Sequence, residues 1–178
     1  NSDKYFETYL NMSGLSQDIS NMTPGEFERA MHLRKKSKRV RDAALKNYIN
    51  GRLGLLIDGT GKDYPKIAKQ KNRLQKVGYD CFMIFVNTDL EVALERNKKR
   101  ERTLPEKLVK DSWQSVQNNL GKFQGLFGTG NMIIVDNSEF KAFPSIVKKG
   151  ANEFITRKIQ NPIAKAWIKK ELELRKKK

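Results

Sequence analysis

The chain has 178 residues, and its 36 Lys and Arg against 20 Asp and Glu give a formal net charge of +16. A single Cys and a single His exclude a disulfide framework and a zinc site of the usual Cys and His composition. The longest uncharged apolar run, Cys81 to Val86, is too short to span a bilayer. We expect one domain with an appendage. The charge favours a polyanion or a phosphorylated small molecule as partner, although a Lys-rich solvated surface has the same composition.

A long helix is predicted in the N-terminal third of the chain. Thr23 and Glu26 have the spacing of a capping box, and the helix that they begin continues through Tyr48. Its segment 34–41 carries six cations among eight residues. These cations either bind phosphates or simply face the solvent.

Three continuous apolar runs predict buried parallel strands, because each run is apolar throughout and ends at polar residues: 53–57 (LGLLI), 81–86 (CFMIFV) and 132–135 (MIIV). Helices are predicted between them at about 64–77, from Thr88 or Asp89, and at about 105–120. The alternation implies right-handed crossovers and an α/β fold with a parallel sheet flanked by helices.

Residues 143–178 are predicted to be mostly helical and basic, with a break at Asn161-Pro162. In the last helix, Ile163, Trp167 and Leu174 recur at helical spacing beside a Lys-rich face. This apolar stripe either docks the helix on the domain or, with the terminal cations, binds a protein partner or a polyanion.

Ligands of open parallel sheets bind beyond the carboxyl ends of the strands. Polar residues follow each predicted strand there, at 58–62 (DGTGK), 87–89 (NTD) and 136–138 (DNS). Ordinary turns and helix caps account for these segments equally well. A further run, 96–102, holds five cations in seven residues. It is either a solvated helix end or a basic lid that closes over a transferred phosphoryl group.

Four segments, in this order, resemble the zeta-toxin and polynucleotide-kinase type of P-loop kinase: NSDKYFE, LLIDGTGKDYPKIAKQKNRLQKVGYDCFMIFVN, ALERNKKRERTLP and MIIVDNS. The resemblance covers residues 1 to about 140 and looks closest to zeta-toxin-like kinases of T4-type tailed phages. It implies a three-layer P-loop kinase-like domain at 1–142, followed by the basic helical extension at 143–178.

The resemblance also implies an ATP- and Mg²⁺-dependent phosphotransferase that acts on a hydroxyl of a nucleotide-like or nucleic-acid substrate. It assigns the catalytic base to Asp3, substrate contacts to Asp58 and Thr60, the lid to Arg96, Arg100 and Arg102, and the surroundings of the adenine to Asp136 and Asn137. In this reading Asp58 and Thr60 contact either the acceptor or Mg²⁺, and no residue is assigned to the metal alone.

Two departures from the family pattern bear on these expectations. Polynucleotide kinases carry an Arg three residues after the catalytic Asp, whereas this chain has Phe6, which argues against a 5′-hydroxyl polynucleotide as substrate. No G-x-x-x-x-G-K-[ST] phosphate loop occurs in the 178 residues. In the family this loop follows the central first strand, so we expect that strand and loop upstream of Asn1.

The alternative function is that of a non-catalytic phage virion or assembly protein, which keeps the kinase fold and binds DNA or acidic partners, such as phage structural proteins, through its basic surface. The expected location is the host cytoplasm for the enzyme and the virion for the alternative. No membrane partner is expected.

Overall fold

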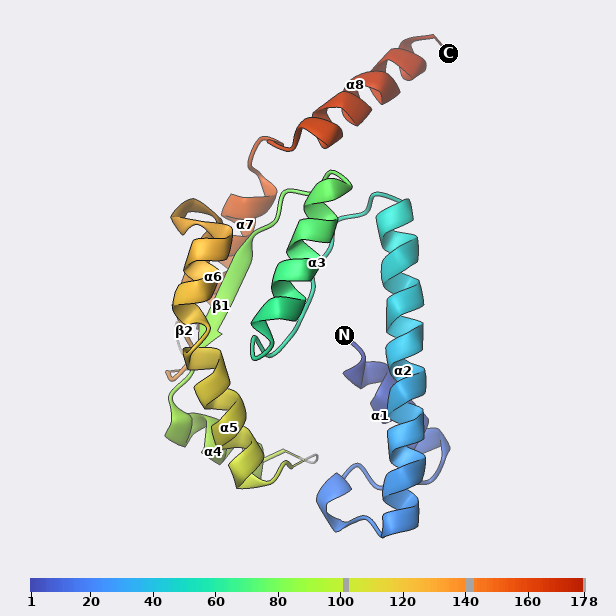
Figure 1. Cartoon of the computed structure of the whole chain (residues 1–178), viewed down its shortest axis with the longest axis vertical. Helices are drawn as coiled ribbons and strands as arrows, with labels where there is room; N and C mark the ends of the chain where they lie inside the picture. The colour runs from blue at the N-terminus through green and yellow to red at the C-terminus, as the bar shows by residue number, and fades with distance from the viewer. Residues whose placement is uncertain (101–102, 140–142, 178) are drawn as a thin grey trace. The chain divides into compact units, whose positions relative to one another are not determined.

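The computed structural model describes residues 1–100, 103–139 and 143–177 (Figure 1). The chain forms two compact units. Unit 1 consists of Asn1–Thr60 and Ala93–Asp111, and unit 2 consists of Gly61–Val92 and Ser112–Lys178. This division differs from a boundary at residue 142, which stays a prediction.

Unit 1 is built on a pair of helices, α1 (Asp3–Met12) and α2 (Pro24–Asn50), connected through a short 3-10 helix, η1 (Ile19–Asn21). The two helices lie side by side in Figure 1. Their shared core contains the buried side chains Phe6, Leu10, Leu15 and Ala30. Burial of these apolar groups, and not helix propensity alone, stabilises the pair.

The predicted capping box at the start of α2 is confirmed. The Thr23 hydroxyl accepts a hydrogen bond from the Glu26 backbone N–H, and the Glu26 carboxylate accepts one of 2.9 Å from the Thr23 backbone N–H. Pro24 occupies the first turn, where no backbone donor is needed. The helix ends at Asn50, two residues beyond the predicted Tyr48.

The predicted strand at 53–57 is wrong, because these residues adopt no regular secondary structure. Leu56 is 95% exposed, and Leu53 and Ile57 are about half exposed. A strand is held by hydrogen bonds to a neighbouring strand, and no strand pairs with this segment within 1–100, 103–139 and 143–177. Apolar composition alone therefore does not form the strand.

Unit 2 contains the two other predicted strands, β1 (Met83–Asn87) and β2 (Met132–Asp136). They pair in parallel, with Met83 opposite Met132 and Asn87 opposite Asp136. Of the predicted parallel sheet, the pairing of these two strands is thus confirmed. A full three-layer kinase sheet stays a prediction.

Three helices pack on this sheet. α3 (Tyr64–Lys76), which was predicted, and α6 (Leu120–Phe127) share a core cluster with one strand face, in which Phe85, Phe123, Phe127 and Met132 are buried. α7 (Phe143–Ile155) packs on the opposite face. There Phe82 stacks on Phe154 at 4.7 Å between ring centroids, and Ile133 fills the space beside Gly150. Successive residues along each strand therefore point to opposite faces of the sheet, as expected for a β-strand.

The crossover between β1 and β2 contains α4 (Leu90–Lys98), α5 (Glu106–Gln117), α6 and a short 3-10 helix, η2 (Thr129–Asn131). The helix predicted at 105–120 therefore ends at Gln117, and a separate helix follows it. The predicted break at Asn161-Pro162 is confirmed, because α7 ends at Ile155 and α8 (Pro162–Lys176) begins after it.

Candidate functional site

Asp3 is the first residue of α1 and lies half-buried at its N-terminus. Its backbone N–H donates a 2.8 Å hydrogen bond to Asn1 Oδ1, so Asn1 closes the turn that leads into the helix. A carboxylate in the first turn of a helix interacts favourably with the helix dipole.

The structure brings the Asp3 motif next to the second predicted site segment. Asn1 Nδ2 donates a hydrogen bond of 2.6 Å to Asp58 Oδ2, across 57 residues of sequence. Asp58 and Thr60 are both exposed in the irregular segment that follows residues 53–57. A predicted base and two predicted substrate contacts therefore belong to one compact unit.

The predicted lid lies between α4 and α5. Arg96 is half-buried on α4, Arg100 is exposed just after it, and Arg102 lies outside the described residues. Asn97 fixes the base of this loop, because its Nδ2 donates to the Leu104 carbonyl at 2.8 Å and its Oδ1 accepts from the Leu104 N–H at 3.1 Å. These two hydrogen bonds hold Leu104 next to Asn97, so the two ends of the segment 97–104 lie close together.

An open hollow of about 330 Å³ lies at this loop. It is lined by Leu94, Asn97, Lys98, Thr103, Leu104 and Glu106, all of unit 1. Nearby, Lys99 pairs with Glu95 at 2.5 Å and one helical turn apart, which holds the pKa of the Glu95 carboxyl below its usual value. The charge of Lys99 is therefore compensated, and among the described residues Lys98 is the cation that lines the hollow.

Unit 2 holds the third predicted site segment, at the carboxyl ends of the two strands. The Asn137 N–H donates to the Asn87 carbonyl at 2.7 Å, and the Asp89 N–H donates to Ser138 Oγ at 3.0 Å. The segments that follow β1 and β2 are thus tied together. Asp136 accepts a 2.8 Å bond from the Ser138 N–H, and the Ser138 backbone and side chain lower the pKa of Asp136.

Asn137 Oδ1 is buried and has no hydrogen-bond partner among the residues that the structure describes. A buried acceptor without a donor costs free energy, and native proteins rarely leave one unpaired. The atom lies in the segment that follows β2, where ligands of parallel sheets bind. The hydrogen-bonding capacity of this oxygen is therefore unused among the described residues.

Sequence reasoning missed three side chains that organise unit 2. Gln117 Nε2 donates to Asn87 Oδ1 at 2.8 Å, and Trp113 Nε1 donates to the Thr88 carbonyl at 2.8 Å. Their spacing of four residues, which places both on one face of α5, was the available signal. Asn119, which is buried, donates from Nδ2 to the carbonyls of Gly61 and Lys62 at 3.1 and 3.0 Å. No local pattern indicated that contact.

Within residues 1–100, 103–139 and 143–177, no group of three or more His, Cys, Asp or Glu side chains could hold a metal ion. Among the same residues, every helix is too short or too polar to cross a membrane.

Comparison with known proteins supplies the family. Residues 20–147 match the family model of the zeta toxin. Because this match covers well over half of the chain, the protein belongs to the zeta-toxin family, which indicates a kinase-type phosphotransferase. No curated protein and no solved structure matches the chain.

The extent of the match separates the site residues into two groups. It begins after Asp3 and therefore leaves the predicted base outside. It includes the strand-end segments, with Asp58, Thr60, Asp136 and Asn137, and the lid cations. The role of Asp3 consequently depends on its motif and on the hydrogen bond between Asn1 and Asp58.

Proposed function

We propose that this protein is an ATP-dependent phosphotransferase that phosphorylates a hydroxyl group of a nucleotide-like or nucleic-acid substrate, with Asp3 as general base. The observation that carries the proposal is the 2.6 Å hydrogen bond from Asn1 to Asp58. It holds the Asn1-Ser2-Asp3 turn beside the loop whose carboxylate and hydroxyl are suited to bind an acceptor.

In this proposal, Asp3 accepts the proton of the acceptor hydroxyl as its oxygen bonds to the γ-phosphorus of ATP. The bond from that phosphorus to the bridging oxygen breaks, and ADP leaves. Asp58 and Thr60 orient the acceptor through hydrogen bonds. Arg96 and Arg100 neutralise negative charge that develops on the transferred group, which is the main way in which proteins assist this reaction.

The nucleotide base has a suitable place at the end of β2. Asn137 Oδ1, a buried acceptor without a partner among the described residues, fits the exocyclic amine of adenine. The described residues contain no cluster of three or more metal-ligating side chains, and Mg²⁺ in phosphoryl transfer is held mainly by the nucleotide phosphates, water and one or two carboxylates. We therefore assign no residue to the metal.

A second candidate function, polyanion binding without turnover, is favoured by α2. Lys35, Lys38 and Arg39 are exposed on this helix, within the cation-rich segment 34–41. Exposed cations on a helix suit phosphate groups, and such binding weakens with salt.

Transfer of label from γ-labelled ATP to a panel of nucleosides, nucleotide sugars and 5′-hydroxyl oligonucleotides separates the two functions. The phosphotransferase labels at least one acceptor, and Asp3→Asn lowers turnover roughly 100-fold or more with nearly unchanged ATP affinity. Asp42→Asn makes the same chemical change on exposed α2 and serves as the matched control. Equal turnover of Asp3→Asn and the parent rejects Asp3 as base. If no acceptor is labelled and the protein binds DNA in a salt-sensitive way, the second function is the correct one.

A further inference from the structure

α2 carries a row of cations on one side. Lys35, Arg39 and Lys46 are exposed, and their spacings of four and seven residues place them on one face of the helix. Ser37, which is fully buried, lies two residues from both Lys35 and Arg39 and therefore on the other side of the helix. We call the row of Lys35, Arg39 and Lys46 the basic face of α2. It extends for about 17 Å along the axis, at about 1.5 Å per residue.

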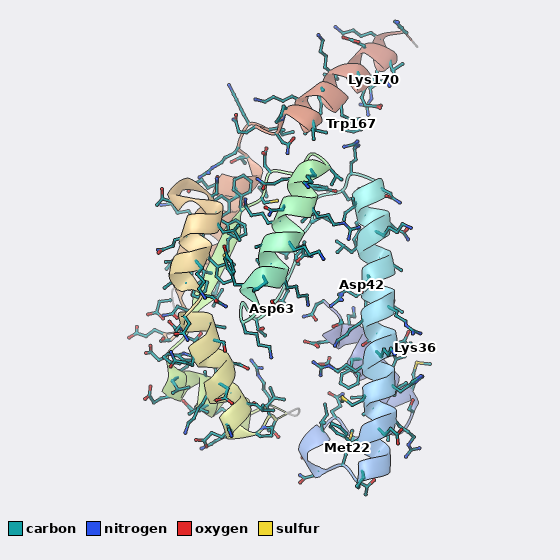
Figure 2. All side chains as sticks on the ribbon, viewed as in Figure 1. Met22, Lys36, Asp42, Asp63, Trp167 and Lys170 are labelled. Carbon is teal, nitrogen blue, oxygen red and sulfur yellow. The ribbon has the colours of Figure 1, made fainter. Side chains whose placement is uncertain are left out.

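Two other cations of α2 are turned toward α1 and are not part of this face. The Arg34 guanidinium lies over the Phe6 ring at 5.5 Å from its centroid, and Lys36 Nζ lies over the Tyr9 ring at 4.6 Å. Figure 2 shows the side chains along α2, with Lys36 labelled. The basic face thus consists of the cations that α1 does not engage through these rings.

The acids of α2 leave the basic face positively charged. From residue 32 to residue 46 the helix has seven Lys and Arg and a single acid, Asp42. Asp42 forms a salt bridge of 2.6 Å with Arg41, so its charge is already compensated. Glu28 lies on the same side as the basic face but two turns before its first cation, about 10 Å along the axis. Within residues 1–100, 103–139 and 143–177, no carboxylate forms a salt bridge with the three cations of the basic face.

The basic face has no apolar anchor. Phe27 and Tyr48 are the exposed large hydrophobic residues of α2, and both lie outside residues 32–46. A protein partner is normally held by a large apolar or aromatic side chain at the centre of the contact. A helix in a membrane surface needs a free apolar face, whereas apolar residues of α2 pack with α1. Single-stranded nucleic acids are bound by stacking on aromatic side chains. The face therefore suits a regular array of phosphates better than any of these partners.

Duplex DNA supplies such an array, because it carries one negative charge per about 1.7 Å of its axis. Its major groove is about 12 Å wide and admits an α-helix, so phosphates can approach the cations of one helix face. The major groove of an RNA duplex is too deep and narrow for this. The geometry of a straight basic row on a long helix thus favours DNA over RNA.

We propose that the basic face of α2 binds the phosphates of duplex DNA through Lys35, Arg39 and Lys46. The binding is independent of sequence, because phosphate contacts position a protein without reading bases. This inference rests on the second candidate function, polyanion binding, and names its surface and its partner. It does not depend on phosphotransferase activity.

The test measures the affinity of the full chain for a fluorescent DNA duplex of about 20 base pairs, by anisotropy, between about 50 and 200 mM salt. We expect the logarithm of the binding constant to fall linearly with the logarithm of the salt concentration. The double variant Lys35→Gln/Arg39→Gln should reduce the steepness of this slope by about 1.8, since each phosphate contact contributes about 0.9. Its affinity at the lowest salt should fall about tenfold or more.

Two controls separate the basic face from net charge and from folding. Ile163 and the backbone of Ala164 lie beside Gly78, so α8 begins against unit 2, and its Lys169 and Lys170 are exposed. Lys169→Gln/Lys170→Gln makes the same change in charge on that helix and should leave the slope nearly unchanged. Lys35→Arg/Arg39→Lys keeps both charges at the basic face and should bind as the parent does.

Several outcomes would overturn the proposal. DNA binding with the same slope in the parent and Lys35→Gln/Arg39→Gln would leave polyanion binding intact but place it elsewhere. Equal losses in the α8 variant would show an effect of net charge. Tighter binding to an RNA duplex, to single-stranded DNA or to polyglutamate at equal salt would show a partner of another class. No binding to duplex DNA at the lowest salt would reject both this inference and the second candidate function, whereas label transfer from ATP tests the phosphotransferase separately.

Discussion

Asn1 and Asp58 are joined by a hydrogen bond of 2.6 Å although 57 residues separate them in sequence. The same Asn1 side chain accepts a bond from the Asp3 N–H, so its amide links the start of α1 to the loop at 58–60. The amide therefore positions a predicted base relative to predicted substrate contacts.

A double-mutant cycle of Asn1→Ala and Asp58→Ala tests this link. Because both residues are exposed, we expect a coupling free energy of at most about 1 kcal/mol in urea unfolding. Asn50→Ala, at the exposed end of α2, serves as the unlinked control and should be additive with Asp58→Ala. Full additivity of Asn1→Ala and Asp58→Ala would show that the bond does not persist in solution.

The capping box of α2 yields a prediction on stability and pH. Thr23→Ala should lower the free energy of unfolding by about 1 kcal/mol, because the N-cap hydroxyl is lost. Hydrogen bonds from the Thr23 hydroxyl and backbone N–H lower the pKa of Glu26 from its ordinary value of 4.5. The contribution of Glu26 is therefore present above pH 4.5 and is lost as the pH falls through the lowered pKa.

Urea unfolding of the parent and Thr23→Ala between pH 3 and pH 7 measures both effects. Thr8→Ala, which removes a hydroxyl from the exposed side of α1, is the control and should change stability little. An identical pH dependence in the parent and Thr23→Ala would argue against the coupling of Thr23 to Glu26.

Asn119 holds two backbone carbonyls of the segment that leads into α3. We expect Asn119→Ala to cost about 1–3 kcal/mol, since the Gly61 and Lys62 carbonyls lose their donor at a buried position. Asn118→Ala changes the neighbouring exposed Asn and should cost much less. Thermal unfolding measures the stability of both variants, and equal losses of stability would contradict the role of Asn119.

The two parallel strands could be predicted from their apolar runs, 81–86 and 132–135, because the two segments pair with each other in the sheet and bury apolar side chains. Residues 53–57 carry the same pattern and form no strand. The pattern records that a segment suits a buried sheet, but the strand forms only where hydrogen-bonding neighbours exist.

The candidate site shows the same limit. Asp58 and Asp136 were found because both follow apolar runs, which is a local signal. The bond between Asn1 and Asp58 and the contacts of Asn119 depend on residues far apart in sequence, and no local spacing encodes them. Gln117 lies between these cases, because its helical spacing from Trp113 was a local signal for its face but not for its contact with Asn87.

Cys81 provides a chemical probe of unit 2. Burial raises the pKa of its thiol above the ordinary value of 9.0, so less reactive thiolate is present at neutral pH. We expect iodoacetamide to react with Cys81 more slowly than it reacts with glutathione at pH 8, and urea to remove the difference. The stability that the protonated thiol contributes to the fold is present below pH 9.0 and is lost as the pH rises through the raised pKa. Modification of the folded chain at the rate of glutathione would contradict the burial.

Gly78 has a φ of +108°, a conformation that side chains with a Cβ rarely adopt. Gly78→Ala should therefore destabilise unit 2 by about 1–3 kcal/mol and loosen the start of α8. Gly121→Ala, within α6 and with no atoms near the added Cβ, is the matched control and should be neutral or stabilising. Hydrogen exchange of the α8 amides measures this loosening. Unchanged exchange would contradict a role of Gly78 in holding the start of α8.

The parallel pairing of β1 with β2 also affects how the protein folds during synthesis. Because the two strands lie about 50 residues apart, β1 leaves the ribosome several seconds before its partner, at typical rates of about 5–20 residues per second. During that interval β2, the strand that pairs with β1 among the described residues, is not yet available to the apolar side chains of β1. The backbone hydrogen bonds of the crossover helices are local, so these helices can form first, and Phe123 and Phe127 of α6 are then available to cover Phe85 before Met132 is made. A nascent chain that stalls ahead of β2 would expose this apolar surface to chaperones.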